Sequence, residues 1–141
     1  MKLSSLISFL VITAIASVSS AHNLTILITN MRTKAGNILV SVYNKEEGFP
    51  KHPETAYIKM KISTAEAAKF TIPNLPTGVY AVAIAHDENK NDEIDTGFLG
   101  IPKEGVGFSR NPSITFGPPK FKESAYTINA DGQIEIKTHY Y

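Results

Sequence analysis

The chain has 141 residues, with 14 Lys and Arg against 13 Asp and Glu, and no cysteine. This balance of charge argues against a nucleic-acid-binding protein, which needs a basic surface to displace counterions from phosphates. Without cysteine, the chain can form no disulfide, use no thiol nucleophile and carry no lipid anchor on cysteine.

The first 21 residues have the layout of a cleavable secretory signal peptide. Lys2 gives a positive start, an apolar run covers residues 6–18, and Ser19 and Ala21 are the small residues expected before a cleavage site. The run is shorter than the roughly 20 apolar residues that span a bilayer. We therefore predict cleavage after Ala21, a periplasmic or secreted protein, and no membrane span after cleavage. Residues 22–141 have the usual size of one domain.

From Leu24 onward, apolar and polar residues alternate with the period of two that is typical of strands with one buried face. We predict seven strands, over residues 24–28, 38–42, 57–62, 68–72, 79–86, 125–128 and 133–137. Residues 63–68 begin like a helix but leave too little length before Pro73, so we predict a hairpin connection there. Short strands separated by turn signals predict an all-β protein, a single small β-sandwich.

Residues 86–124 form a long connection that is rich in Gly, Pro, Asn and Asp and shows no sustained period. Long connections in compact domains are usually functional or disordered. We predict an ordered Gly/Pro-rich loop that packs on the sandwich through its apolar side chains, which are Phe98, Leu99, Ile101, Val106, Phe108, Ile114, Phe116 and Phe121.

Oxygen-bearing side chains alternate directly after the predicted strand 79–86. Calcium prefers six to eight oxygen ligands, and a loop that curls around the ion presents them at every second residue. Asp87, Asn89 and Asn91 would supply side-chain oxygens, Glu93 a backbone carbonyl, and Asp95 a direct or water-mediated ligand. One hypothesis is therefore a calcium site formed by these five residues.

The pattern departs from a standard calcium loop at two places. Asp92 stands at the sixth position, where glycine is usual, and Phe98 stands at the twelfth, where a bidentate Glu is usual. Glu104 or another segment would have to supply the missing carboxylate. The alternative hypothesis is a plain solvated turn held by Asx-type hydrogen bonds.

Cleavage after Ala21 would make His22 the N-terminal residue, whose amine and imidazole could both bind one copper ion. His86 or His139 would then complete a copper site of a carrier or an oxidative enzyme. No Gly-x-Ser-x-Gly elbow or phosphate-binding glycine loop occurs in the sequence, which indicates a protein that is not an enzyme.

Several linked motifs resemble a known family. They are residues 75–80 (Leu-Pro-Thr-Gly-Val-Tyr), 86–91 (His-Asp-Glu-Asn-Lys-Asn), 95–96 (Asp-Thr), 99–109 (Leu-Gly-Ile-Pro-Lys-Glu-Gly-Val-Gly-Phe-Ser) and 116–121 (Phe-Gly-Pro-Pro-Lys-Phe). In these motifs the chain is similar to the exported bacterial proteins grouped as domain of unknown function 2141. The resemblance implies a signal peptide and a small β-sandwich of the transthyretin-like or carboxypeptidase-regulatory-like kind, and no established activity.

Three hypotheses about function follow. The first is a non-enzymatic exported binding or accessory module whose working part is the loop 86–121, which binds calcium and recognises an envelope protein or a carbohydrate. The second is a copper protein that uses His22. The third is a structural envelope protein in which this loop packs against a partner.

Overall fold

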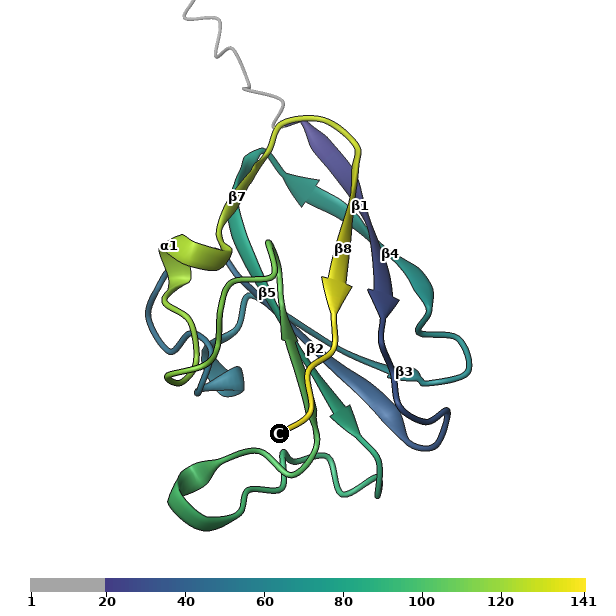
Figure 1. The fold of residues 1–141 in the computed structure, drawn as a ribbon. Coiled ribbons are helices and arrows are strands. Elements are labelled where there is room, and N and C mark those ends of the chain that lie inside the picture. Colours follow the sequence, from purple (N-terminus) through teal and green to yellow (C-terminus); the bar gives the residue numbers. More distant parts are fainter. Residues whose placement is uncertain (1–19) are drawn as a thin grey trace, which may run out of the picture.

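The computed structural model describes residues 20–141, which form two β-sheets packed against each other (Figure 1). The predicted signal peptide lies, up to residue 19, outside the described residues. The strands are β1 (Ala21–Thr29), β2 (Asn37–Tyr43), β3 (Ile58–Ser63), β4 (Lys69–Pro76), β5 (Gly78–Asp87), β6 (Gly105–Phe108), β7 (Tyr126–Ile128) and β8 (Gly132–Lys137). The short helices are η1 (Pro53–Thr55), η2 (Phe98–Gly100) and α1 (Phe121–Ser124), and none of these described helices could cross a membrane.

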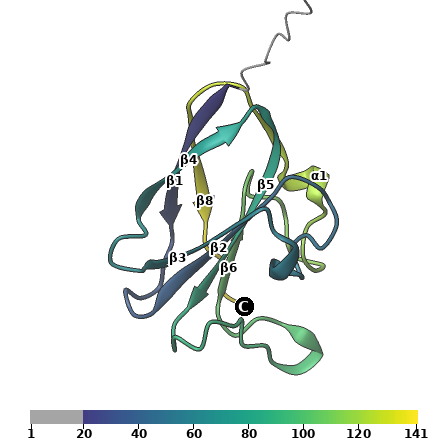
Figure 2. The same ribbon diagram turned by 180° about the vertical axis from the view of Figure 1, so that it is seen from behind.

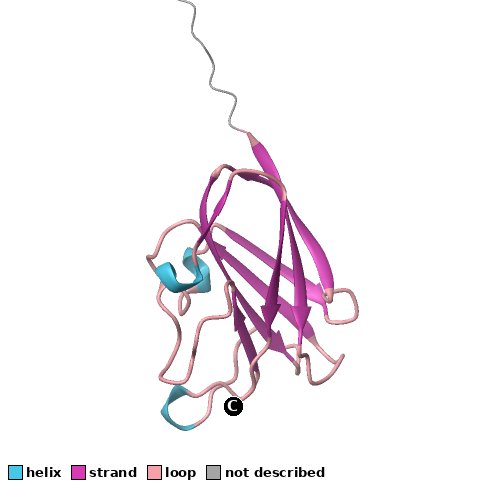
Figure 3. Ribbon diagram, turned by 45° about the horizontal axis from the view of Figure 1, so that its top comes forward, coloured by secondary structure: helices cyan, strands magenta, loops and turns pink. Residues whose placement is uncertain are grey.

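The smaller sheet has the order β4-β1-β8, with β1 antiparallel to β4 and parallel to β8. The larger sheet has the order β3-β2-β5-β6 and is antiparallel throughout, while β7 pairs with the first residues of β5. Figure 3 shows the strands as two layers with most of the irregular chain gathered on one side. The predicted all-β sandwich is thus confirmed.

The core between the sheets is formed by the alternating apolar residues that the sequence predicted. Leu24 and Ile26 of β1 and Ile38 of β2 are completely buried, and Val82 of β5 packs in the same cluster. The core-facing apolar side chains of these strands are therefore removed from water, which contributes roughly 25 cal/mol per Å² of apolar surface.

The structure contradicts the hairpin predicted for the connection over residues 63–68. Residues 64–68 form turns rather than a helix, as expected, but β3 and β4 do not make a hairpin because they belong to different sheets. The connection carries the chain from one sheet to the other and is anchored by Thr64, whose hydroxyl donates to the carbonyl of Ala35 at 3.1 Å.

The long connection is ordered, but it contains an unpredicted strand, β6, and not all of its apolar residues pack down. Phe108 and Ile114 join Tyr43 in a second cluster, on the outer face of the larger sheet. In contrast, Phe98 and Phe116 are exposed to 86% and 104%. The prediction that all these side chains pack on the sandwich was therefore wrong for the loop tips.

Candidate functional site

A groove of about 1010 Å³ lies on the outer face of the larger sheet, beneath the connections that follow β2, β5 and β6. Its floor consists of short or apolar side chains from three neighbouring strands, namely Leu39, Ser41, Ala83, Ala85, Val106 and Phe108. Side chains alternate between the two faces of a strand, so β5 turns Tyr80, Val82 and Ile84 into the core and alanines outward. The small alanines leave the space that the groove occupies.

Two connections wall the groove with apolar side chains. The β5–β6 connection contributes Ile94, Leu99 and Ile101, and the connection after β6 contributes Phe116. Figures 1 and 2 show both connections on the same side of the larger sheet. Large apolar side chains that stay exposed beside a groove usually mark a binding surface.

Leu99 presents its side chain from a left-handed backbone conformation, with φ 59°, followed by Gly100 at φ 72°. A bulky residue with positive φ is uncommon and costs about 1–2 kcal/mol. Despite this cost the Leu99 side chain is 81% exposed, so no packing in the free protein compensates for the conformation. Such strain tends to occur at functional sites.

The predicted calcium residues form a tight loop beside the groove, which we call the acidic loop (residues 87–95). Asp87 is completely buried, and its two carboxylate oxygens accept the backbone N–H groups of Asn91 at 3.1 Å and Asp92 at 2.9 Å. The chain curls around this carboxylate, with left-handed conformations at Lys90 and Asp92. Asp92 therefore adopts the conformation that favours glycine at that position.

The structure brings four of the five predicted side chains together. Asn89 and Asn91 donate from their amides to the two carboxylate oxygens of Asp95, at 2.6 and 3.1 Å. Glu93 is exposed, and its backbone N–H donates to the side-chain oxygen of Asn91 at 3.0 Å. Glu93 is thus held in the loop through its backbone N–H, while its side chain is exposed.

Glu104 closes the acidic loop from outside. It is 5% exposed, and its two oxygens accept the backbone N–H groups of Glu88 at 2.9 Å and Asp95 at 3.1 Å. The carboxylate that the sequence analysis required from another segment therefore lies against both ends of the loop.

Two carboxylates of this region have cationic partners and four do not. Asp92 pairs with Lys61 at 2.9 Å, and Glu88 pairs with Arg32, whose hydrogen bond lowers the pKa of Glu88 below its ordinary value. Within the described chain, no cation lies within ion-pair distance of the other four, which are Asp87, Glu93, Asp95 and Glu104. In residues 20–141, no three His, Cys, Asp or Glu side chains form a ready-made metal group, so a cation here would also need amide and carbonyl oxygens.

A buried polar network fixes the end of β5 from which the acidic loop starts. The ring of His86 bonds the Ala35 carbonyl through Nε2 at 2.8 Å and the Tyr140 hydroxyl through Nδ1 at 2.7 Å. Because a carbonyl only accepts, the geometry assigns the proton of the neutral ring to Nε2. Arg32 stacks on the Tyr140 ring at 4.4 Å and ties this network to Glu88.

Among the described residues, the structure keeps His86 and His139 away from His22. His22 lies at the start of β1, where its Nε2 contacts the hydroxyl of Thr77 at 2.9 Å, just before β5. His86 lies at the other end of β5, about 26 Å away for eight residues of strand. His139 pairs with Val106 of β6 opposite this same end of β5. In the described part of the chain, neither His86 nor His139 can therefore share an ion with His22.

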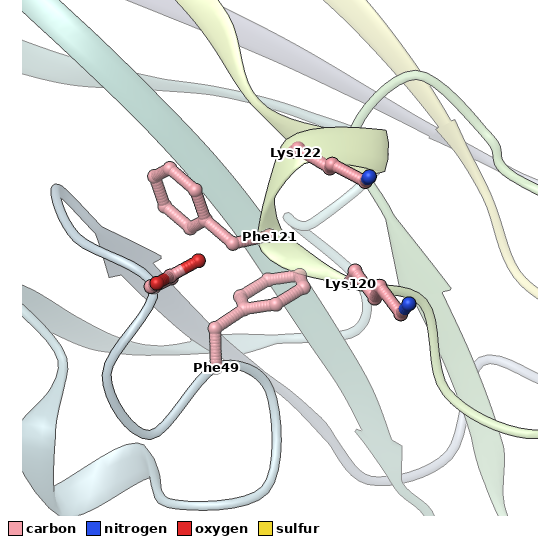
Figure 4. A pocket seen from close by; sticks show the side chains of 5 residues that line it. Phe49, Lys120, Phe121 and Lys122 are labelled. Atoms are coloured by element: carbon pink, nitrogen blue, oxygen red, sulfur yellow. The ribbon is translucent and has the colours of Figure 1, made fainter.

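A second, smaller depression of about 330 Å³ lies between the β2–β3 connection and α1 (Figure 4). Phe49 and Phe121 meet there edge to face, with ring centroids 5.9 Å apart, and the side chains of Lys120 and Lys122 point away from the rings. The aromatic contact fastens the β2–β3 connection to α1, and we assign this depression a packing role.

The acidic loop was predictable from the sequence, and the groove was not. The loop is local in sequence, whereas the groove needs three connections that converge on one sheet face. The only sequence signal was the alternation of Ala81, Ala83 and Ala85 with large residues, which indicates a strand with one recessed face.

The comparisons with known proteins agree with the resemblance seen in the motifs. No curated protein and no solved structure matches the chain. The family described as "Uncharacterized protein conserved in bacteria (DUF2141)" matches residues 26–137, which include every strand from β2 to β8, the acidic loop and the walls of the groove. The chain therefore belongs to this family of uncharacterised bacterial proteins.

Proposed function

We propose that this protein is an exported, non-enzymatic binding module that holds an elongated apolar ligand in the groove of the larger sheet. The groove itself is the observation that carries the proposal, because its floor and walls are mainly apolar and its volume of about 1010 Å³ suits a small molecule. Burial of one large apolar wall side chain against a ligand would contribute roughly 1.5–3 kcal/mol.

The polar residues of the groove support binding rather than catalysis. Among the described residues that line it, only Lys51, Asp92, Glu93 and Tyr141 titrate, and Asp92 is already paired with Lys61. General acid–base chemistry needs a titrating group within hydrogen-bond reach of a reacting atom, usually together with a second group that activates or orients it. This lining offers no histidine and no hydroxyl paired with a base.

The test is the binding of N-phenyl-1-naphthylamine, an uncharged dye whose fluorescence rises in apolar surroundings. The chain has no tryptophan, so the protein contributes little background. We expect saturable binding, which Ala85→Phe abolishes by filling the floor and Phe116→Ser weakens by removing an exposed wall. Phe116→Ser changes no buried contact, so its effect is independent of folding.

Ala130→Phe is the matched control for Ala85→Phe, since Ala130 is exposed in the turn before β8, away from the groove. It should bind the dye as the unmodified protein does. Dye binding that is absent, or that persists unchanged in both groove variants, would contradict the proposal. Co-purification of an envelope protein without dye binding would instead favour the structural role.

We also propose that the acidic loop binds calcium. The specific support is the convergence of Asn89, Asn91 and Asp95 beside Asp87 and Glu104, two buried carboxylates without a cationic partner in the described chain. Buried anions are costly unless they are paired or hydrogen-bonded, and backbone N–H groups supply only part of this compensation. A calcium ion would complete it with the oxygen ligands that the ion prefers.

Calorimetric titration of the protein with calcium chloride up to millimolar tests this second proposal. We expect a heat of binding and a higher melting temperature, and Asp95→Asn should weaken the affinity at least about tenfold by removing ligand charge. Glu66→Gln, at an exposed carboxylate in the β3–β4 connection, is the control of equal charge change. Absence of both heat and stabilisation at millimolar calcium would leave the plain turn as the correct interpretation.

A further inference from the structure

We infer that the ligand of the groove is a free long-chain carboxylate, with its acyl chain on the alanine floor and its headgroup at Lys51. This inference rests on the proposed apolar-ligand function and goes beyond it by naming the ligand class. It follows from two features of the lining, namely the shortage of polar partners and the position of the charges.

The β5 alanines of the floor lie in a strand that is paired on both sides. Ala83 and Ala85 of β5 pair with β2 on one side and with β6 on the other, so the sheet hydrogen bonds are already made. A bound peptide would bury N–H and C=O groups against this floor, at about 1–3 kcal/mol for each group left without a partner. An acyl chain buries no polar group and avoids this cost.

The shortage of polar partners in the lining also disfavours a carbohydrate ligand. A sugar ring needs several hydrogen-bond partners, and among the described lining residues the side-chain hydroxyls are those of Ser41, Thr96, Thr115 and Tyr141. Two of these are already engaged, since the Tyr141 hydroxyl donates to the carbonyl of Ile114 at 3.2 Å and the Thr115 hydroxyl bonds the hydroxyl of Ser113 at 3.2 Å. The lining therefore selects a ligand whose body is hydrocarbon.

The charges at the rim select the headgroup. Lys51 lines the groove between Pro50 and Pro53, and none of the described carboxylates lies within ion-pair distance of its ammonium group. Asp92 is neutralised by Lys61, whereas Glu93, on the β5–β6 connection, is exposed and would repel an anion. An anionic headgroup is therefore complementary to the part of the rim that carries Lys51.

The size of the groove favours a monomeric amphiphile over a membrane surface. A volume of about 1010 Å³ is close to the upper end of small-molecule sites, roughly 300–1,000 Å³. The floor is recessed beneath the two walls, so a lipid in a bilayer would have to leave the bilayer to reach Ala83 and Ala85. A single acyl chain with a small headgroup can do this.

Displacement of bound N-phenyl-1-naphthylamine by sodium dodecanoate and by 1-dodecanol tests the inference. The two competitors share the chain length and differ in charge. We expect both to displace the dye, and Lys51→Gln to weaken dodecanoate about tenfold relative to dodecanol. Glu93→Gln should strengthen dodecanoate, because it removes the opposing charge. Lys34→Gln, at an exposed lysine in the β1–β2 connection, is the matched control.

The outcomes separate the inference from the proposal on which it rests. If the dye does not bind, the proposed function itself fails. If the dye binds but dodecanoate does not displace it, or displaces it equally well in Lys51→Gln, the carboxylate inference is wrong and the apolar groove stands. Binding to phosphatidylglycerol vesicles without displacement by dodecanoate would identify a membrane surface instead, and concentration-dependent dimerisation that excludes the dye would identify a second copy of the chain.

Discussion

At the scale of single residues, Leu99 combines an unfavourable backbone conformation with an exposed apolar side chain. Its left-handed conformation, at φ 59°, is one that glycine adopts without strain. A residue selected only for folding would not combine these two features, because the conformation costs free energy and the side chain recovers none in the free protein. Leu99 is consistent with a residue whose partner arrives from outside.

Leu99→Gly should therefore leave the melting temperature unchanged or slightly higher while weakening binding of the dye several-fold. Relief of the left-handed conformation should raise the free energy of unfolding by about 1–2 kcal/mol. The greater freedom of glycine in the unfolded chain should lower it by roughly 0.5–1 kcal/mol. Thermal melts and dye titrations measure the two effects separately. Lys90→Gly relieves a similar conformation outside the groove and should leave dye binding intact. A clear fall in the melting temperature of Leu99→Gly would show that Leu99 packs in the free protein.

At the scale of elements, the strands that alternate cleanly were predictable and β6 was not. The prediction of β1 rests on Leu24, Ile26 and Ile28, because every second residue there is large and apolar. In β6, glycine occupies alternate positions, at Gly105 and Gly107, and glycine is depleted in strands. The need for these glycines is not local, because an added Cβ at Gly107 would lie 2.8 Å from Ile136 on the opposite sheet and 3.0 Å from Ile84. No pattern within β6 could reveal that constraint.

Gly107→Ala should destabilise the protein by about 1–3 kcal/mol, the usual effect of overpacking a filled core. The matched change is Gly132→Ala at the start of β8, where an added Cβ would meet nothing within 4 Å. There we expect stability to rise by about 0.4–1 kcal/mol, because alanine restricts the unfolded chain. Chemical denaturation of both variants gives the comparison, and equal stabilities would contradict the tight contact between the two sheets at β6.

At the scale of the whole molecule, the sequence predicted two packed sheets, but it did not predict which strand belongs to which sheet. The turn signals at Gly36 and Gly78 resemble hairpin turns, yet β1 and β4 lie in one sheet and β2 and β5 in the other. Local turn residues determine that the chain reverses, whereas the choice of sheet depends on which strand is free to pair. The acidic loop was predictable because one short segment forms most of it, and the sequence already suggested Glu104 as one possible source of a further carboxylate. The groove was not predictable, because it depends on this global arrangement.

The proposed export concerns the whole molecule, and it predicts a cleavage site next to the start of β1. β1 begins at Ala21, and His22 is already paired with Leu75 of β4. Cleavage after Ala21 would thus remove the apolar segment and keep nearly all of β1. Mass spectrometry of the protein from the periplasm or culture medium should find His22 at the N-terminus. An uncleaved chain retained in the cytoplasm would contradict the predicted signal peptide.

The parallel pairing of β1 with β8 has a mechanical consequence. Residues 24–29 of β1 pair in register with residues 132–137 of β8, so the two strands run in the same direction. A force that pulls on the start of β1 and the end of β8 would load the evenly spaced hydrogen bonds of this pair together, in shear, instead of opening them one at a time. The resistance of the folded domain to stretching between these two points would therefore reside in this strand pair.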